Sequence, residues 1–126
     1  MSYYQIAKKA MYVNISDAVA MNAKPKYALL SVAMPSDITK SQMKELACGF
    51  NDVANEFDVE IIGGDTISNT KLDITITIIS KTDKPLLRNK VKENNLLAYT
   101  GDLGRSKKDL KKLLYGGKIN KNSKFN

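Results

Sequence analysis

The sequence of 126 residues contains no histidine, no tryptophan and a single cysteine, Cys48. The absence of histidine excludes catalysis by Ser-His-Asp or Cys-His groups, and with it the usual zinc sites built from imidazole and thiolate. One cysteine cannot form a disulfide within the chain. Any chemistry must therefore use carboxylates, hydroxyls, backbone amides, lysine or arginine, and a metal held by such groups is a hard cation such as magnesium.

Long apolar segments are also missing. The sequence has no apolar run of about 18 residues, and Met1 is not followed by the charged and apolar regions of a secretory signal. We therefore expect no membrane span and a cytoplasmic location. The composition, 43% hydrophobic and 26% charged, is typical of one globular domain with a modest core.

The net charge of +7 is unevenly distributed along the chain. Residues 1–80 carry 7 basic and 9 acidic side chains, whereas residues 81–126 carry 13 basic and 4 acidic side chains. The lysines of the second part are scattered and have no aromatic ladder beside them. We therefore interpret them as a solvated face and do not expect a nucleic-acid partner.

Apolar residues at helical spacing predict a first helix over residues 3–22. The stripe is formed by Ile6, Ala7, Ala10, Val13, Ala18 and Met21. Asn14 and Asp17 fall within the same arc, which predicts that both are buried. A buried carboxylate is costly unless it is paired or binds a cation. The alternative is that Asp17 is partly exposed near a frayed helix end.

The middle of the chain predicts a strand and a second helix. The continuous apolar run over residues 27–34 is typical of a central strand covered on both faces. Thr39 or Ser41 is expected to cap the helix that follows, whose apolar stripe ends at Phe57. Cys48 lies nearly opposite that stripe, which predicts a surface thiol.

The stretch VEIIGGDT, residues 59–66, joins a β-branched run to two glycines and a carboxylate. One interpretation is a strand over 59–62 followed by a turn at Gly63-Gly64-Asp65. The other is a functional loop, since backbone N–H groups at glycines approach phosphate oxygens without an intervening Cβ. Residues 72–80 then alternate as a strand with one apolar and one polar face.

The character of the sequence changes at about residue 81. Residues 81–95 are polar and lysine-rich, which predicts a linker, and a short strand is expected over 96–100. Ser106 and Asp109 form a capping pattern for a last helix of about ten residues, which Gly116-Gly117 end. Neither the P-loop nor the dinucleotide fingerprint occurs in the sequence.

Four blocks of the sequence resemble a known family. The run VNISDAVAMNAKP, residues 13–25, closely resembles the Val-Asn-Leu-Ser-Asp-x-Ala-Ala-Met-Gly-Ala-x-Pro block of thiamine-monophosphate kinases. Met34-Pro35, IGGDT over 62–66 and YTGDLGRS over 99–106 match later blocks in order and spacing. The match to the wider superfamily of aminoimidazole-ribonucleotide synthetase is looser. Arg105 departs from the pattern, because the family usually has an aspartate there.

The resemblance implies an ATP-dependent phosphotransferase that moves the γ-phosphoryl of ATP onto thiamine monophosphate with the help of Mg²⁺, giving thiamine diphosphate. By the same resemblance Asp17 and Asp65 are magnesium ligands. Gly64, Asp65 and Arg88 are implied to bind the nucleotide. A homodimer formed through the sheet is also expected.

For the fold we expect an α/β chain of the α+β type, with a mixed sheet and flanking helices. The resemblance makes residues 1–80 most of a synthetase-like N-terminal ATP-binding domain, and 81–126 a linker and the opening of a C-terminal domain. Family members have further N-terminal strands and a longer C-terminal domain, so the chain is expected to have reduced activity or none alone. The alternatives are a non-catalytic remnant or binding module, or another ATP-dependent synthetase of the superfamily.

Overall fold

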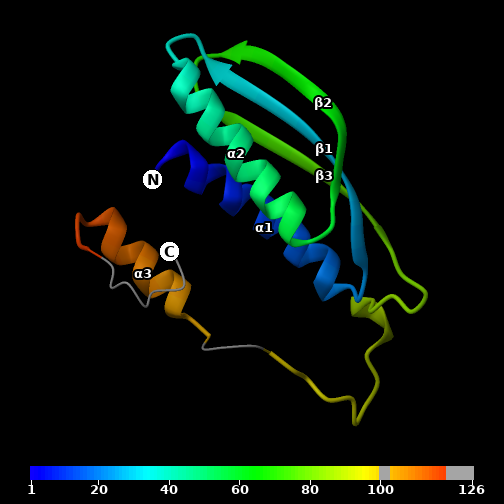
Figure 1. Ribbon diagram of the computed structural model, residues 1–126. Coiled ribbons are helices and arrows are strands. Elements are labelled where there is room, and N and C mark those ends of the chain that lie inside the picture. The colour runs from blue at the N-terminus through cyan, green and yellow to red at the C-terminus, as the bar shows by residue number, and fades with distance from the viewer. Residues whose placement is uncertain (100–102, 119–126) are drawn as a thin grey trace. The chain divides into compact units, whose positions relative to one another are not determined.

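The computed structural model describes residues 1–99 and 103–118. The chain divides into two compact units, Met1–Val91 and Lys92–Asn126. In the first unit two helices cover one face of a three-stranded sheet (Figure 1). The domain boundary expected near residue 80 stays a prediction.

The first unit contains, in chain order, α1 (Tyr3–Ala20), β1 (Lys24–Pro35), α2 (Lys40–Glu56), β2 (Glu60–Asn69), β3 (Asp73–Lys81) and the 3-10 turn η1 (Arg88–Lys90). The central strand is β1, which pairs with β2 in parallel and with β3 antiparallel. The sheet is therefore mixed, and the predicted fold class is confirmed.

Both long helices begin with a capping box. Ser2 Oγ accepts a hydrogen bond from the Gln5 backbone N–H, and Thr39 Oγ1 accepts one from the N–H of Gln42. Each glutamine side chain accepts in return from the N–H of its capping residue. These bonds satisfy N–H groups that a helix leaves without partners. Thr39 is thereby confirmed as the cap of the second helix.

The core lies where the two helices meet each other and the sheet. Its buried residues are Ala7, Met11, Ile15, Ala28, Val32, Leu46, Phe50, Val53, Ala54, Val59 and Ile76. The helices approach closely at Gly49, where a Cβ would lie 2.5 Å from the Tyr4 carbonyl oxygen. Cys48, the residue before Gly49 in α2, is exposed as expected.

Two pairs of side chains tie the helices together at their outer surface. The Tyr4 hydroxyl donates to Asp52 at 2.8 Å, and the Tyr12 hydroxyl donates to Glu56 at 2.6 Å. The pKa of Tyr12 is raised above its usual value of about 10. The largest cause is the hydrogen bond to Glu56, and burial and the negative charge of the Glu56 carboxylate act in the same direction.

The predicted buried stripe of α1 is wrong in its direction. The helix buries the row Ala7, Met11 and Ile15, while Val13 is 52% exposed. The face is decided by the close approach to α2, which accepts one narrow row and leaves the edges of the predicted stripe in solvent. Asp17 is exposed, so its predicted burial is wrong.

The predicted turn at Gly63-Gly64-Asp65 is also wrong, because β2 runs through it without interruption. Ala28 of β1 pairs with Ile61, and the next residue, Leu29, pairs with Gly63. Ile62 is therefore the extra residue of a β-bulge. A glycine pair permits the unusual backbone that a bulge needs, just as it permits a turn.

The other face of the sheet is open in this chain. Its exposed apolar residues are Tyr27 at 42%, Leu29 at 37%, Ile67 at 58% and Ile79 at 45%. The prediction that the central strand is covered on both faces is therefore wrong for a single chain. The predicted alternation of β3 is confirmed, since Ile76 is buried while Thr75 and Thr77 are exposed.

The second unit contains α3 (Arg105–Leu114), which confirms a last helix of about ten residues. Gly104 occupies its N-cap position, and Ser106 lies inside the helix, so the predicted cap at Ser106 is wrong. Residues 96–99 form no strand, and residue 100 lies outside the described residues. No described helix is both long enough and apolar enough to cross a membrane.

We expect Gly49→Ala to lower the free energy of unfolding by about 1–3 kcal/mol, because the added methyl forces α1 away from α2. This loss outweighs the gain of about 1 kcal/mol in helix propensity. Urea denaturation followed by circular dichroism measures the change. Cys48→Ala, on the exposed side of the same turn, is the control and should stay within about 0.5 kcal/mol. A Gly49→Ala variant as stable as the parent would contradict the close helix crossing.

The bulge predicts unequal effects of alanine at its two glycines. A Cβ at Gly64 would lie 1.7 Å from the Leu30 carbonyl oxygen, whereas one at Gly63 would lie 3.6 Å from the nearest side-chain atom. The φ angles are similar, 158° at Gly63 and 154° at Gly64, so the backbone strain of an alanine should be similar at the two positions. We expect Gly64→Ala to destabilise the chain by at least about 3 kcal/mol and Gly63→Ala by clearly less. Equal losses in thermal unfolding would rule out this packing.

Candidate functional site

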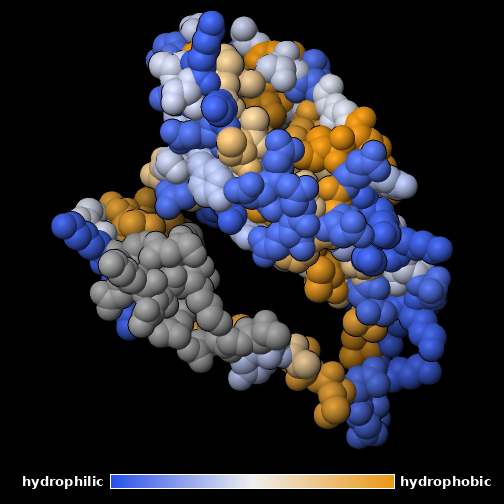
Figure 2. All heavy atoms as spheres, in the orientation of Figure 1, coloured by the Kyte–Doolittle hydropathy of each residue, from blue (hydrophilic) through white to orange (hydrophobic). Residues whose placement is uncertain are grey.

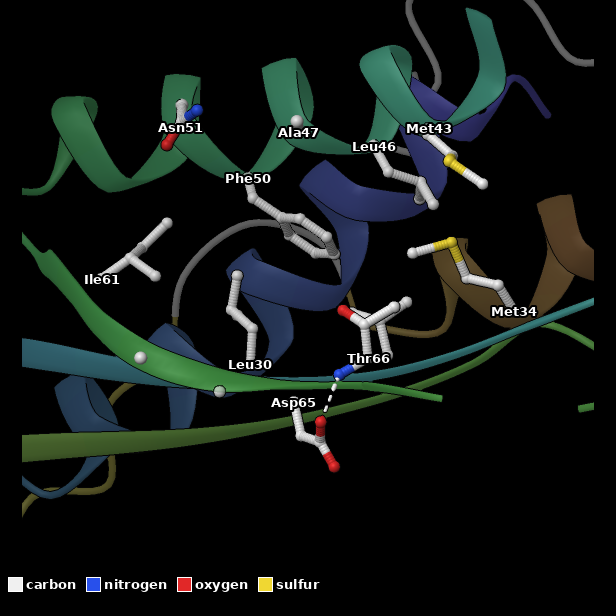
Figure 3. Close-up of a pocket in the computed structure, with 13 residues that line it drawn as sticks. Leu30, Met34, Met43, Leu46, Ala47, Phe50, Asn51, Ile61, Asp65 and Thr66 are labelled. Atoms are coloured by element: carbon white, nitrogen blue, oxygen red, sulfur yellow. Dashed lines mark hydrogen bonds between the residues drawn. The ribbon is translucent and has the colours of Figure 1, made fainter. Parts of the chain in front are cut away.

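The bulge decides on which face of the sheet Asp65 lies. With Ile62 as the extra residue, Gly64 pairs with Leu30 and Asp65 pairs with Ser31. In Figure 3 Leu30 and Thr66 point towards the helices, and Asp65 points away from them. Without the extra residue Asp65 would stand opposite Val32, which is 7% exposed, and its carboxylate would enter the core.

Asp65 shares its row of the sheet with two hydroxyl side chains on the open face. Its Oδ1 accepts a hydrogen bond from the Thr66 N–H at 2.8 Å. Ser31 pairs with it across β1, and Thr75 pairs with Ser31 from β3, so a carboxylate and two hydroxyls share one row of the sheet. In the described part of the chain no cationic side chain pairs with Asp65. Carboxylate and hydroxyl oxygens are ligands that suit Mg²⁺.

Gly64 has a structural reason to be glycine. A side chain there would collide with the backbone of β1 at Leu30, so the strand pairing itself requires the missing Cβ. The implied role of Gly64 in nucleotide binding stays a prediction.

A groove of about 560 Å³ lies on the helix side of the bulge, between α2 and the β1–β2 edge (Figure 3). Its walls are mostly apolar and are formed by Leu30, Val32, Met34, Met43, Leu46, Ala47, Phe50, Asn51, Ile61, Gly63, Gly64, Asp65 and Thr66. Figure 2 shows hydrophobic residues between α2 and β2 beside the hydrophilic outer surface of the helices. Sequence reasoning missed this groove, because it depends on how far α2 stands from β2.

Asp17 lies near the end of α1 and is exposed. It is about 200° around α1 from the buried Ile15 and therefore points away from the core. Asp65 belongs to β2 and points to the open face of the sheet, so the two predicted ligands come from different layers of the fold. Among residues 1–99 and 103–118, no group of three or more cysteine or acidic side chains is placed to hold a metal.

Arg88 lies at the same end of the first unit as Asp17. The segment before it is fixed to the end of α1, because the Leu86 N–H donates to the Met21 carbonyl oxygen at 3.0 Å. Asp17 is one helical turn before Met21. Arg88 is exposed and, within the described residues, has no acidic partner.

Comparisons with known proteins agree with the resemblance found in the sequence. The thiamine-monophosphate kinase of Bacillus subtilis (strain 168) is 41% identical over 112 residues, which are 86% of this chain and 34% of that protein. The crystal structure of thiamine monophosphate kinase from Aquifex aeolicus superposes with a TM-score of 0.83 at 25% identity, covering 96% of this chain and 41% of that one. A structure described as AaThiL complexed with AMPPCP and TMP gives a TM-score of 0.81 at 25% identity, covering 97% and 40%.

The chain spans about a third of the length of the curated relatives it matches. The family model for the N-terminal domain of AIR synthase related proteins matches residues 1–82. That match covers more than half of the chain. The chain therefore belongs to the family of AIR synthase related proteins, whose N-terminal domain its residues 1–82 match.

Proposed function

We propose that this chain is part of a thiamine-monophosphate kinase, which transfers the γ-phosphoryl of ATP to thiamine monophosphate in the cytoplasm. The similarity to the Bacillus subtilis enzyme over 112 residues carries the proposal. The complex of AaThiL with AMPPCP and TMP supports the choice of an ATP-dependent reaction. The chain spans about a third of the length of these relatives. We therefore expect this chain alone to bind Mg²⁺–ATP with reduced or no formation of thiamine diphosphate.

Asp65 is the residue that we propose to hold Mg²⁺. Its exposed carboxylate belongs to the residue that pairs with Ser31 across the sheet. It has no cationic partner among the described side chains. When bound, the cation neutralises charge on the phosphates of ATP. Phosphoryl transfer depends mainly on positioning and charge neutralisation, so a chain without histidine can carry it out.

We propose that Gly64 contacts nucleotide phosphates beside Asp65, and that Arg88 contacts a phosphate at the end of the first unit where α1 ends. The backbone at Gly64 is free of a side chain, and the Arg88 guanidinium can donate two parallel hydrogen bonds to a phosphate. Asp17 is a second proposed magnesium ligand. Its exposed carboxylate has no cationic partner among the described side chains.

We expect the chain to bind Mg²⁺–ATP, and Asp65→Asn to weaken that binding about tenfold or more, because one negative charge at the cation is lost. Isothermal titration calorimetry measures the affinity. Asp73→Asn removes another exposed carboxylate from the open face and is the matched control, with unchanged affinity expected.

The outcomes separate the candidate roles. Thiamine diphosphate formed from thiamine monophosphate in proportion to chain concentration identifies an active kinase, while Mg²⁺–ATP binding without turnover identifies a remnant or binding module. Unchanged Mg²⁺–ATP affinity in both Asp17→Asn and Asp65→Asn would refute the site assignment.

We also propose that two copies associate through the open face of the sheet. Leu29 and Ile67 expose apolar area on neighbouring strands of that face, and Tyr27 and Ile79 extend it. A sheet face with this much uncovered apolar surface is stabilised when a partner excludes water from it.

Leu29→Asp should therefore convert a dimer into a monomer, because it places a charge at the centre of the proposed contact. Sedimentation velocity measures the mass. Val13→Asp changes an exposed apolar residue on the outer surface of α1 and should leave the dimer intact. A monomeric parent chain at about 100 μM would contradict the proposed dimer.

A further inference from the structure

An open basin of about 510 Å³ lies at the end of the sheet where β1 begins and β3 ends. It is lined by Val19, Asn22, Ala23, Lys24, Lys81, Thr82, Asp83 and Lys84. Along β1, Lys24 is seven residues from Ser31, the partner of Asp65, which is about 23 Å in a strand. The basin is therefore separate from the proposed site at Asp65.

The lining of the basin carries an excess of positive charge, and repulsion between its lysines destabilises the sheet. Its lining holds three lysines against the single carboxylate of Asp83, a surplus of two positive charges. Lys24 and Lys81 stand directly opposite each other in the antiparallel pair of β1 and β3. Like charges at paired positions destabilise a sheet, so this pair costs stability unless an anion lies between them.

The nearby carboxylates do little to offset this charge. Asp58 Oδ2 lies 3.8 Å from Lys24 Nζ and is shared with Lys26 Nζ at 3.6 Å. Within residues 1–99 and 103–118, Lys81 and Lys84 form no ion pair. Two ammonium groups of the basin are thus available to an anion from solution.

The wall that carries Lys84 is fixed in place. The Asn22 side-chain amide donates to the Lys84 carbonyl oxygen at 3.0 Å, and the Leu86 N–H donates to the Met21 carbonyl oxygen at 3.0 Å. The Thr82 hydroxyl accepts from the Lys84 N–H at 3.3 Å. Asn22 has a φ of 58°, the left-handed conformation common at the residue that follows the end of a helix. The loop is therefore held against the end of α1 before any ligand arrives.

We propose that this basin binds the phosphate group of a small phosphorylated molecule. A phosphate carries up to two negative charges and several acceptor oxygens, which match the charge surplus and the lysine donors. The volume is within the range of small-molecule sites. The proposal does not depend on the kinase assignment, because it concerns phosphate binding without a metal.

A structural role for the lysines is the competing explanation. The last turn of α1 has no basic residue, and its carbonyl groups carry partial negative charge that nearby lysines complement. In that case loss of a lysine lowers thermal stability but leaves the response to phosphate unchanged.

The test is a titration of the full chain with inorganic phosphate, without magnesium and at constant ionic strength. Backbone amide shifts in nuclear magnetic resonance spectra are followed, with chloride in place of phosphate as the control. We expect saturable shifts centred on residues 22–24 and 81–84. Lys81→Gln and Lys84→Gln should each weaken phosphate binding about tenfold. Lys44→Gln, an exposed lysine of α2, is the matched control and should change nothing.

Identical responses to phosphate and chloride would overturn the proposal, as would unchanged phosphate affinity in both basin variants. If thiamine monophosphate displaces inorganic phosphate at a lower concentration than metal-free ATP does, the basin binds the phosphate of thiamine monophosphate. If ATP displaces it at the lower concentration, the basin binds a phosphate of the nucleotide. Phosphate binding that persists in Asp65→Asn while Mg²⁺–ATP binding is lost would support two separate sites. Phosphate binding lost in Asp65→Asn would contradict a separate basin.

Discussion

The contact between Gly64 and the Leu30 carbonyl oxygen is the constraint on which the site depends. A side chain at residue 64 would lie 1.7 Å from that oxygen, so β2 pairs with β1 only because glycine stands there. The bulge at Ile62 then shifts the alternation of β2 by one residue. As a result Thr66 points towards the helices. Asp65, which pairs with Ser31, points to the open face of the sheet instead of entering the core.

The two faces of the sheet consequently have different properties. One is closed by α1 and α2, whose close crossing at Gly49 fixes the helix layer and leaves an apolar groove beside β2. The other carries Asp65 and a set of exposed apolar side chains. The lysine basin lies at a third position, at the end of the sheet. The metal and the second copy are thus both assigned to the open face, whereas the anion is assigned to the end of the sheet, so the anion assignment can fail without the other two.

The features that the sequence predicted depend on neighbours along the chain. Of the two predicted caps of α2, Thr39 is the one that the structure shows, and the predicted alternation around Ile76 is confirmed; both are local patterns. The direction of Asp17 was not predictable, because the face of α1 is set by its approach to Gly49, more than thirty residues away. The glycine pair was misread as a turn for a similar reason. A bulge and a turn use the same backbone freedom, and the choice is made by the partner strand at Leu30.

The resemblance to thiamine-monophosphate kinases indicated the family, but it gave no spatial relation between Asp17 and Asp65. Paramagnetic broadening by Mn²⁺, added in place of Mg²⁺ together with ATP, locates the bound cation directly in amide spectra of the chain. If Asp65 holds the cation, signals of residues 64–66 and of Ser31 and Thr75 on the open face should broaden first, while Val53 in the helix layer stays sharp. Broadening centred elsewhere, with residues 64–66 unaffected, would contradict the placement of the cation at the bulge.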